Sequence, residues 1–434
     1  MQTTYFDDVF PGVALTCVTT EKFKTGCISV SFVTTLNRKD ASMNALISRV
    51  LRRGCDGLPD IYQISSALDD LYGARIESFI RKKGELQCIG FYSDFPDDRY
   101  LPGNNRLLED TTALLGRILL SPSISDGCLR YDYVESEKNI LIDDIHASIN
   151  DKGGYVIDKL LAEMCSNEPF GINKLGYEAE IQAITAETLT LHYYKLLESA
   201  RIEILYCGVA SPERVLASVK EALSNLPVRK VIGLTPTLVI EKPFQESPRR
   251  FEEELDIAQG KMAIGYRLGR KPGDTLNYPA LMVFNSIFGS GATSKLFLNV
   301  REKLSLCYYI SSMTERHKEV MIVSSGVDFT KFDTVLSEIQ IQLNCIKNGD
   351  FNDTDLVTSK RLLASSLRAA FDRPESIEGL YFDSRIAAHP YDPAKLHEGV
   401  SEVKPDDIIS LSSGIAADTI YCLKGREGVS NNEA

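Results

Sequence analysis

Closely spaced cysteine pairs are missing from this chain of 434 residues. It contains ten cysteines, but no two of them stand in a C-x-x-C spacing. They are scattered, and several lie in apolar runs that resemble strands, such as residues 205–207. The pattern disfavours a zinc knuckle or a disulfide framework, and it predicts reduced, buried thiols that act as small apolar side chains.

Long apolar runs and a basic leader are also missing. No run approaches the roughly 20 apolar residues that are needed to span a bilayer, and the first residues, MQTTYFDDVFPG, are acidic rather than basic and apolar. The net charge of −12 disfavours binding to nucleic acid or to an anionic membrane surface, because both need a concentrated basic face. We therefore expect a cytoplasmic protein that binds neither.

Histidine is scarce, and its spacing excludes a local zinc motif. The five histidines are His146, His192, His317, His389 and His397. The closest pair, His389 and His397, is separated by two prolines and cannot present two ligands at i and i+4 of one helix.

Residues 289–295 lack the Gly-Lys-Ser/Thr order of a P-loop, and the chain has no G-x-S-x-G elbow.

Two halves of the chain follow one plan. Each opens on a strand after a glycine, in which apolar residues alternate as in a strand with one buried face. A helical stretch that ends at glycine follows, and each half closes on a strand that contains Tyr-Cys. The matching segments are 26–32, 44–54 and 202–208 in the first half, and 260–266, 278–289 and 419–423 in the second.

The grouping of strands and helices favours an α+β fold, with helices packed on one face of each sheet. Prolines interrupt a polar stretch between residues 227 and 250, which is where the junction between the halves is expected. The predicted domains are residues 1–230 and 231–434.

The most informative stretch is FGSGATSKLFLNVREKLSLCYYI, which ends at residue 310. It predicts a glycine-rich turn at Gly289 and Gly291, then a helix that carries Arg301, and then a strand that carries Tyr308. The helix-to-strand step is expected to bring the Arg301 and Tyr308 side chains close together. Read without further context, Arg301 is an exposed helical arginine and Tyr308 a core aromatic residue.

The order SKLF, VREK, LCY in this stretch resembles SRLF, VREK, LAY in the second half of the insulinase/pitrilysin/mitochondrial-processing-peptidase family of zinc metallopeptidases. The resemblance extends from about residue 26 to 425. It implies two similar α+β domains, each a mostly antiparallel sheet backed by helices, that close like a clam shell. One departure is Ser305, which stands where the family usually has glycine.

The family's inverted zinc motif, H-x-x-E-H, is absent. Aligned on Arg53-Gly54, the two histidine positions of the family fall on Ala45 and Arg49, and the position of the glutamate base falls on Ser48. The resemblance places the third ligand position on Asp144. One carboxylate does not hold zinc, so we expect no metal or other cofactor in this chain. We expect Arg49 to pair with Asp144 instead, although the arginines there could also form an ordinary solvated face.

The resemblance implies a role for Arg301 and Tyr308. In the family this pair contacts the substrate, and some members divide the work between a chain with the zinc motif and a chain with the pair. The first hypothesis is therefore a non-catalytic subunit of a heteromeric peptidase, inactive alone. It would bind a peptide or unfolded protein and supply Arg301 and Tyr308 to the zinc site of a partner from the same family.

Two alternatives stay open. The chain could be a scaffold or peptide-binding protein with no role in proteolysis, comparable to core subunits of respiratory complexes that derive from this family. It could also be an active lone peptidase, which requires a metal site that the sequence does not show. The sequence does not distinguish a homodimer from a heterodimer.

Overall fold

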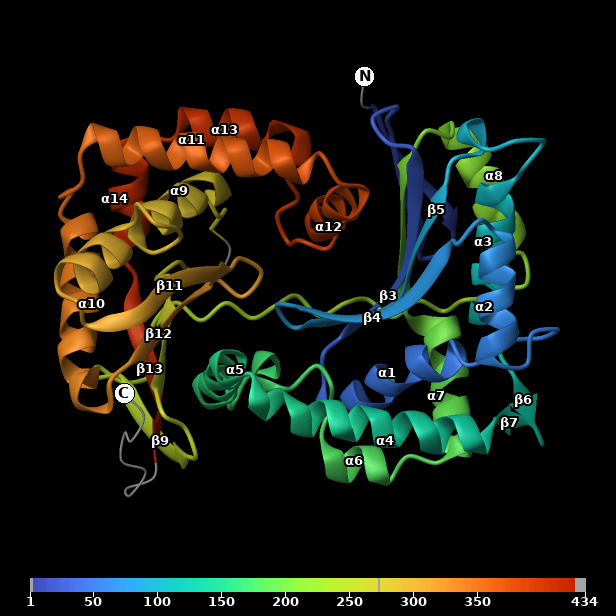
Figure 1. Cartoon of the computed structure of the whole chain (residues 1–434), viewed down its shortest axis with the longest axis horizontal. Coiled ribbons are helices and arrows are strands. Elements are labelled where there is room, and N and C mark those ends of the chain that lie inside the picture. Colours follow the sequence, from blue (N-terminus) through green and yellow to red (C-terminus); the bar gives the residue numbers. More distant parts are fainter. Residues whose placement is uncertain (1–2, 272–273, 426–434) are drawn as a thin grey trace. The chain divides into compact units, whose positions relative to one another are not determined.

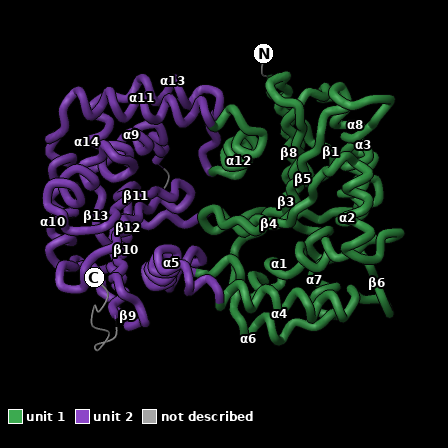
Figure 2. The backbone as a smooth tube through the Cα atoms, viewed as in Figure 1, with its two compact units in different colours: residues 1–146, 172–236, 370–387 green, residues 147–171, 237–369, 388–434 purple. Residues whose placement is uncertain are grey.

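The computed structural model describes residues 3–271 and 274–425 (Figure 1). The chain folds into two compact units, which Figure 2 shows in different colours. Each unit contains a segment from the opposite half of the sequence. Unit 1 comprises residues 1–146, 172–236 and 370–387, and unit 2 comprises residues 147–171, 237–369 and 388–434. The predicted domain boundary at residue 230 stays a prediction.

Unit 1 is built on a six-stranded sheet with the strand order β1-β2-β8-β3-β5-β4. Neighbouring strands are antiparallel, except that β2 and β8 are parallel. The strands are β1 (Thr3–Phe10), β2 (Val13–Thr19), β3 (Thr25–Thr35), β4 (Arg75–Lys83), β5 (Leu86–Pro96) and β8 (Arg201–Gly208). A separate short hairpin joins β6 (Ile124–Ser125) and β7 (Cys128–Leu129).

Helices cover one face of this sheet in a large apolar core, to which β3 contributes Ile28, Val30 and Phe32. The helices of unit 1 are α1 (Arg38–Leu51), α2 (Ile61–Asp70), α3 (Leu107–Leu120), α4 (Tyr131–Ala147), α6 (Glu178–Gln182), α7 (Ala186–Ser199), α8 (Pro212–Ala222) and α12 (Pro374–Arg385). Helix α1 begins six residues before the predicted start at residue 44. The Asn37 side chain accepts a hydrogen bond from the Asp40 N–H and thereby caps the N-terminus of α1.

Unit 2 is built on a five-stranded sheet with the order β11-β12-β10-β13-β9. Here β13 and β9 are parallel, and the other pairs are antiparallel. The strands are β9 (Arg249–Leu255), β10 (Gly260–Arg267), β11 (Cys307–Glu315), β12 (Val320–Val327) and β13 (Ala416–Gly425). The helices are α5 (Lys152–Met164), α9 (Tyr278–Phe288), η4 (Leu296–Lys303), α10 (Phe332–Lys347), α11 (Asp353–Ala370), α13 (Leu396–Glu402) and α14 (Pro405–Ser413). The chain also forms single turns of 3-10 helix. In unit 1 this is η1 (Asp98–Tyr100), and in unit 2 these are η2 (Ser148–Asn150), η3 (Pro169–Gly171), η5 (Phe329–Lys331) and η6 (Pro393–Lys395).

The two sheets share one topology. In unit 1 the order β2-β8-β3-β5-β4 begins with a parallel pair and continues antiparallel, and in unit 2 the order β9-β13-β10-β12-β11 does the same. The strand that closes each half, β8 or β13, lies beside the strand after the glycine, β3 or β10. The predicted fold class, two mostly antiparallel sheets backed by helices, is confirmed, and unit 1 has β1 as an additional edge strand.

The second face of each sheet is also covered, which corrects the prediction of one buried face. In unit 1, Ile377, Tyr381 and Phe382 of α12 pack against Cys27, Cys88 and Cys207 of the sheet. Alternating serines in β3 suggested an exposed face. Ser29 is fully buried instead, and it donates a hydrogen bond of 2.8 Å to Glu378 of α12.

Helix α5 covers the second face of the sheet in unit 2. Its Val156, Leu160 and Met164 pack against Ala263 and Leu423. A Cβ atom on Gly265 of β10 would lie 2.3 Å from the Met164 sulfur, so glycine is required for this close approach. Arg267, fully buried on β10, forms ion pairs with Glu168 at 2.6 Å and with Asp418 at 2.9 Å.

All ten cysteines lie within the described residues and are free, as predicted. Seven are buried, and Cys128, Cys307 and Cys345 are half-buried. None of the helices in the described part of the chain is both long enough and apolar enough to cross a membrane.

Candidate functional site

The glycine-rich turn places a short helix beside the edge of the unit 2 sheet. Gly289 ends α9, and a Cβ atom there would lie 2.5 Å from the Ser312 hydroxyl of β11. Ser294 then starts the next helix, because its hydroxyl accepts a hydrogen bond from the Phe297 N–H. The helix, η4, is a π-helix that Leu296 and Val300 anchor with fully buried side chains.

Arg301 extends from the last turn of η4. Its guanidinium lies 4.7 Å from the centre of the Phe297 ring, which supports the side chain from one side. The closest carboxylate contact is from Nε to Glu302 Oε1 at 3.7 Å, which is too long for a hydrogen bond. The side chain is 41% exposed, so its donors remain accessible.

A β-bulge determines the direction of Tyr308. Cys307 pairs with Val327 and Tyr309 with Gly326, so Tyr308 is an extra residue in β11 without a partner in β12. In a regular strand Tyr308 would share a face with the buried Ile310. The bulge turns its ring outward instead, and Tyr308 is 61% exposed. The interpretation of Tyr308 as a core residue is therefore excluded.

Arg301 and Tyr308 line the same hollow, which confirms the prediction that the helix-to-strand step brings them together. The hollow has a volume of about 450 Å³. It is lined by Arg301, Glu302, Ser305, Leu306, Cys307, Tyr308, Asp328 and Lys331. Burial raises the pKa of the Cys307 thiol despite the nearby Arg301 cation, so Cys307 is protonated at neutral pH and is not an activated nucleophile.

Sequence reasoning missed Asp328 and Lys331. They follow β12, at least 20 residues after Tyr308, and they reach the hollow because β12 runs antiparallel to β11. No local motif marks them. Only the pairing of the two strands could have placed them beside Tyr308.

In unit 1 the predicted pair between Arg49 and Asp144 is present. Arg49 Nη2 of α1 lies 2.7 Å from Asp144 Oδ2 of α4. In the turn after α1, Arg53 Nη1 lies 3.2 Å from Glu137 Oε1. Burial raises the pKa of Glu137, and the cations of Arg53 and Arg49 oppose that shift. Two arginine–carboxylate pairs thus join α1 and the turn after it to α4, at the positions where the resemblance places the metal of the family.

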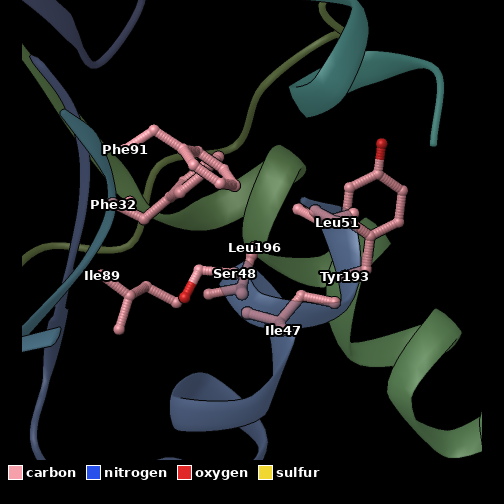
Figure 3. A pocket seen from close by; sticks show the side chains of 9 residues that line it. Phe32, Ile47, Ser48, Leu51, Ile89, Phe91, Tyr193 and Leu196 are labelled. Atoms are coloured by element: carbon pink, nitrogen blue, oxygen red, sulfur yellow. The ribbon is translucent and has the colours of Figure 1, made fainter. Parts of the chain in front are cut away.

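Ala45 and Ser48 provide no chemistry for catalysis. Ala45 is fully buried in the core. Ser48 lies among apolar side chains, including Phe32, Ile89 and Leu196, around a pocket of about 10 Å³ (Figure 3). Its hydroxyl is buried without a hydrogen-bond partner. A serine in this position cannot activate water as the family's glutamate does.

The donor set of unit 1 does not fit zinc. The four positions carry one methyl group, one hydroxyl, one guanidinium and one carboxylate, and a cation at Arg49 repels a metal ion. All five histidines are described, and nowhere in residues 3–271 and 274–425 do three His, Cys, Asp or Glu side chains gather into a possible metal site. The Arg301 and Arg49 sites belong to different units.

These features define a peptidase-type fold without the peptidase's metal ligands, and comparison with known proteins identifies the family. Residues 183–363 match the model of the peptidase M16 inactive domain. The chain is 31% identical over 419 residues to a probable inactive metalloprotease, YmfF, of Bacillus subtilis, covering 96% of this chain and 97% of YmfF. It therefore belongs to the insulinase/pitrilysin-like M16 peptidase family, as a member without the zinc motif.

Solved structures share the fold over nearly the whole chain. A conserved protein from Enterococcus faecalis has a TM-score of 0.88 at 25% identity, with 98% of this chain and 100% of that chain covered. A peptidase M16 inactive domain from Pseudomonas fluorescens has a TM-score of 0.77 at 16% identity, with 98% of each chain covered.

Proposed function

We propose that this chain is the non-catalytic subunit of a heteromeric M16 peptidase, and that it binds the peptide substrate through Arg301 and Tyr308. One observation carries the proposal. The accessible donors of Arg301 and Tyr308 line one hollow, while an arginine–carboxylate pair occupies the zinc-ligand positions of the same chain.

The chemistry of the two side chains suits a peptide carbonyl. A guanidinium and a phenol both donate hydrogen bonds, and neither needs to lose a proton at neutral pH. Donors directed at a carbonyl oxygen also stabilise the negative charge that develops there when the bond is attacked. Arg301 and Tyr308 would therefore hold the substrate and polarise it, but they cannot activate water.

Strand β11 offers a backbone for the rest of the peptide. It is the edge strand of the five-stranded sheet. On its outer row Ser312 is already paired, since its N–H donates to the Gly289 C=O and its C=O accepts from the Asn285 side chain, so a peptide would use the other outer groups of the strand. An extended peptide can add to such an edge by main-chain hydrogen bonds. Tyr308 lies at the beginning of this strand, where it would contact a peptide bound along it.

Zinc would come from a partner subunit of the same family that carries H-x-x-E-H. In this proposal the first half of the chain, residues 1–230, carries the degenerate site, and the second half, residues 231–434, carries Arg301 and Tyr308. The substrate is a peptide or an unfolded protein, the pair is cytoplasmic, and this chain contains no cofactor of its own.

The test is reconstitution of this chain with a zinc-motif subunit of the M16 family from the same cells, assayed on unstructured peptides with and without a chelator. We expect cleavage by the pair that the chelator abolishes. Arg301→Ala should lower kcat/KM by about 100-fold, as expected for the loss of one donor to a developing oxyanion. Tyr308→Phe should lower it less, because the ring remains.

Arg361→Ala, an exposed arginine on α11, is the matched control and should leave the activity unchanged. Size-exclusion chromatography of each pair separates loss of catalysis from loss of assembly. If Arg301→Ala only weakened assembly, or if the assembled pair cleaved peptides equally well without Arg301, the chain would be a scaffold.

A further inference from the structure

Lys331 adds a second positive charge to the hollow that Arg301 and Tyr308 line. Its position is fixed locally. The Asp328 side chain caps the turn η5 by accepting a hydrogen bond of 2.9 Å from the Thr330 N–H, and the Lys331 N–H donates to the Asp328 C=O. The next residue, Phe332, is buried at the start of α10. The backbone at Lys331 is thus held on both sides, while its side chain is exposed.

Among the charged groups that line the hollow, Asp328 has the strongest partners. The Lys331 cation lies close enough to Asp328 to help lower the pKa of that carboxyl, and Arg301 and Glu302 share only a contact of 3.7 Å. In contrast, Asp328 Oδ1 accepts hydrogen bonds from both the N–H and the hydroxyl of Thr330. These bonds lower the pKa of Asp328, which is therefore a firmly ionised cap rather than a group that awaits a ligand.

We propose that Lys331 and Arg301 form a carboxylate subsite beside Tyr308, so that this chain selects peptides that carry a negative charge near the bound segment. The proposal rests on the proposed function, since it specifies the substrate class of the same site. A carboxylate accepts hydrogen bonds through two oxygens, and an arginine, a lysine and a phenol around it all donate. Two cations in a hollow of about 450 Å³ leave room for a side chain as well as for the peptide backbone.

The carboxylate could be an Asp or Glu side chain, or the α-carboxylate at the peptide's end. Selection by Lys331 also has a direction, because a peptide with Lys or Arg at this place would meet two like charges and bind more weakly. An acidic chain with net charge −12 would otherwise favour basic peptides by its overall field. The subsite therefore predicts a preference for acidic peptides, which is opposite to the preference expected from the net charge.

The experiment measures binding of fluorescent peptides to the full chain by anisotropy at low salt. Three peptides differ at one group: a central Glu with an amidated C-terminus, a central Gln with an amidated C-terminus, and a central Gln with a free C-terminal acid. We expect one acidic peptide to bind about 2- to 5-fold more tightly than the neutral one, since exposed ion pairs are worth about 1 kcal/mol or less. The acidic peptide that binds more tightly shows whether the bound carboxylate is a side chain or the C-terminus.

Lys331→Gln should abolish most of this preference, and Lys331→Arg should restore it. Lys395→Gln, at an exposed lysine of η6 outside the hollow, is the control and should keep the preference. Equal binding of all three peptides to the wild-type chain, or an unchanged preference in Lys331→Gln, would overturn the subsite. An acidic preference together with full activity of the Arg301→Ala pair would instead refute the proposed function and leave the subsite standing.

Discussion

Two backbone irregularities position Tyr308. The bulge in β11 turns its ring away from the face where Ile310 is buried. Three residues earlier, Ser305 has φ = +48°, in the left-handed region that favours glycine. The resemblance indicates glycine at this position in the family, and Ser305 adopts the left-handed conformation at a cost in backbone strain. That cost can be measured.

Ser305→Gly is expected to stabilise unit 2. A non-glycine residue in the left-handed region costs about 1–2 kcal/mol, and part of the gain is lost because glycine has more conformational freedom in the unfolded chain. The net increase in the free energy of unfolding should be about 0.5–1 kcal/mol, measured by urea denaturation. Ser121→Gly, where φ is −134°, should lower the stability instead. Equal effects of the two changes would mean that the turn at Ser305 stores no strain.

At this scale the sequence predicted which residues lie together better than how they point. The order of turn, helix and strand was enough to place Arg301 and Tyr308 together, and the family resemblance was enough to pair Arg49 with Asp144. The outward direction of Tyr308 depends on how β11 pairs with β12, which is a non-local property. The same pairing brings Lys331 into the hollow, so neither could be read from local spacing.

At the scale of elements, helices α5 and α12 have equivalent roles. Each follows a long helix, α4 or α11, and each covers the second face of a sheet whose first face is already packed. The alternating serines of β3 therefore suggested an exposed face where a buried one exists. No local pattern indicated the covering helix, because α12 begins more than 330 residues after the end of β3.

Glu378 anchors α12 to its sheet. It is 1% exposed, accepts a hydrogen bond from Ser29, and forms an ion pair of 3.0 Å with Arg81 of β4. Glu378→Ala leaves the buried Ser29 hydroxyl without this partner and Arg81 without its carboxylate, so we expect a loss of about 2–4 kcal/mol in the free energy of unfolding.

The measurement is urea denaturation, together with hydrogen exchange of the amides of α12. Protection of α12 should fall more than that of α1, since only α12 loses an anchor. Glu375→Ala, at a residue of α12 whose side chain is 57% exposed, serves as the control and should change the stability by less than about 0.5 kcal/mol. A similar loss in both variants would show that helix propensity, rather than the buried contacts, holds α12.

At the scale of the whole molecule, the compact units and the sequence halves do not coincide segment by segment. Residues 147–171 belong to unit 2, and residues 370–387 belong to unit 1. The repeat in the sequence corresponds to the strand order that the two sheets share. One passage between the units, at residues 236–237, lies in the proline-interrupted polar stretch 227–250. The assignment of α5 and α12 depends instead on long-range contacts, which no local pattern marks.

Fragments 1–230 and 231–434 should therefore not fold fully when each is produced alone. The first would lack α12 over the unit 1 sheet, and the second would lack α5 over the unit 2 sheet, so each would expose an apolar face. Produced together, they should form a 1:1 complex with the circular dichroism of the intact chain, as measured by size-exclusion chromatography with light scattering. Removing residues 370–387 from the second fragment should weaken this complex, because of the two exchanged helices α5 alone remains. Two fragments that are each monomeric and cooperatively folded would contradict the prediction.

The reciprocal position of α5 and α12 also bears on how such a chain could arise. An ancestor of half the length, with one sheet and one copy of the helix, could cover its sheet only by lending that helix to an identical copy and receiving the same helix in return. Such an exchange has two-fold symmetry and closes on itself. Fusion of two gene copies would preserve the exchange while freeing the two halves to diverge. One half could then lose its metal ligands while the other kept its arginine and tyrosine.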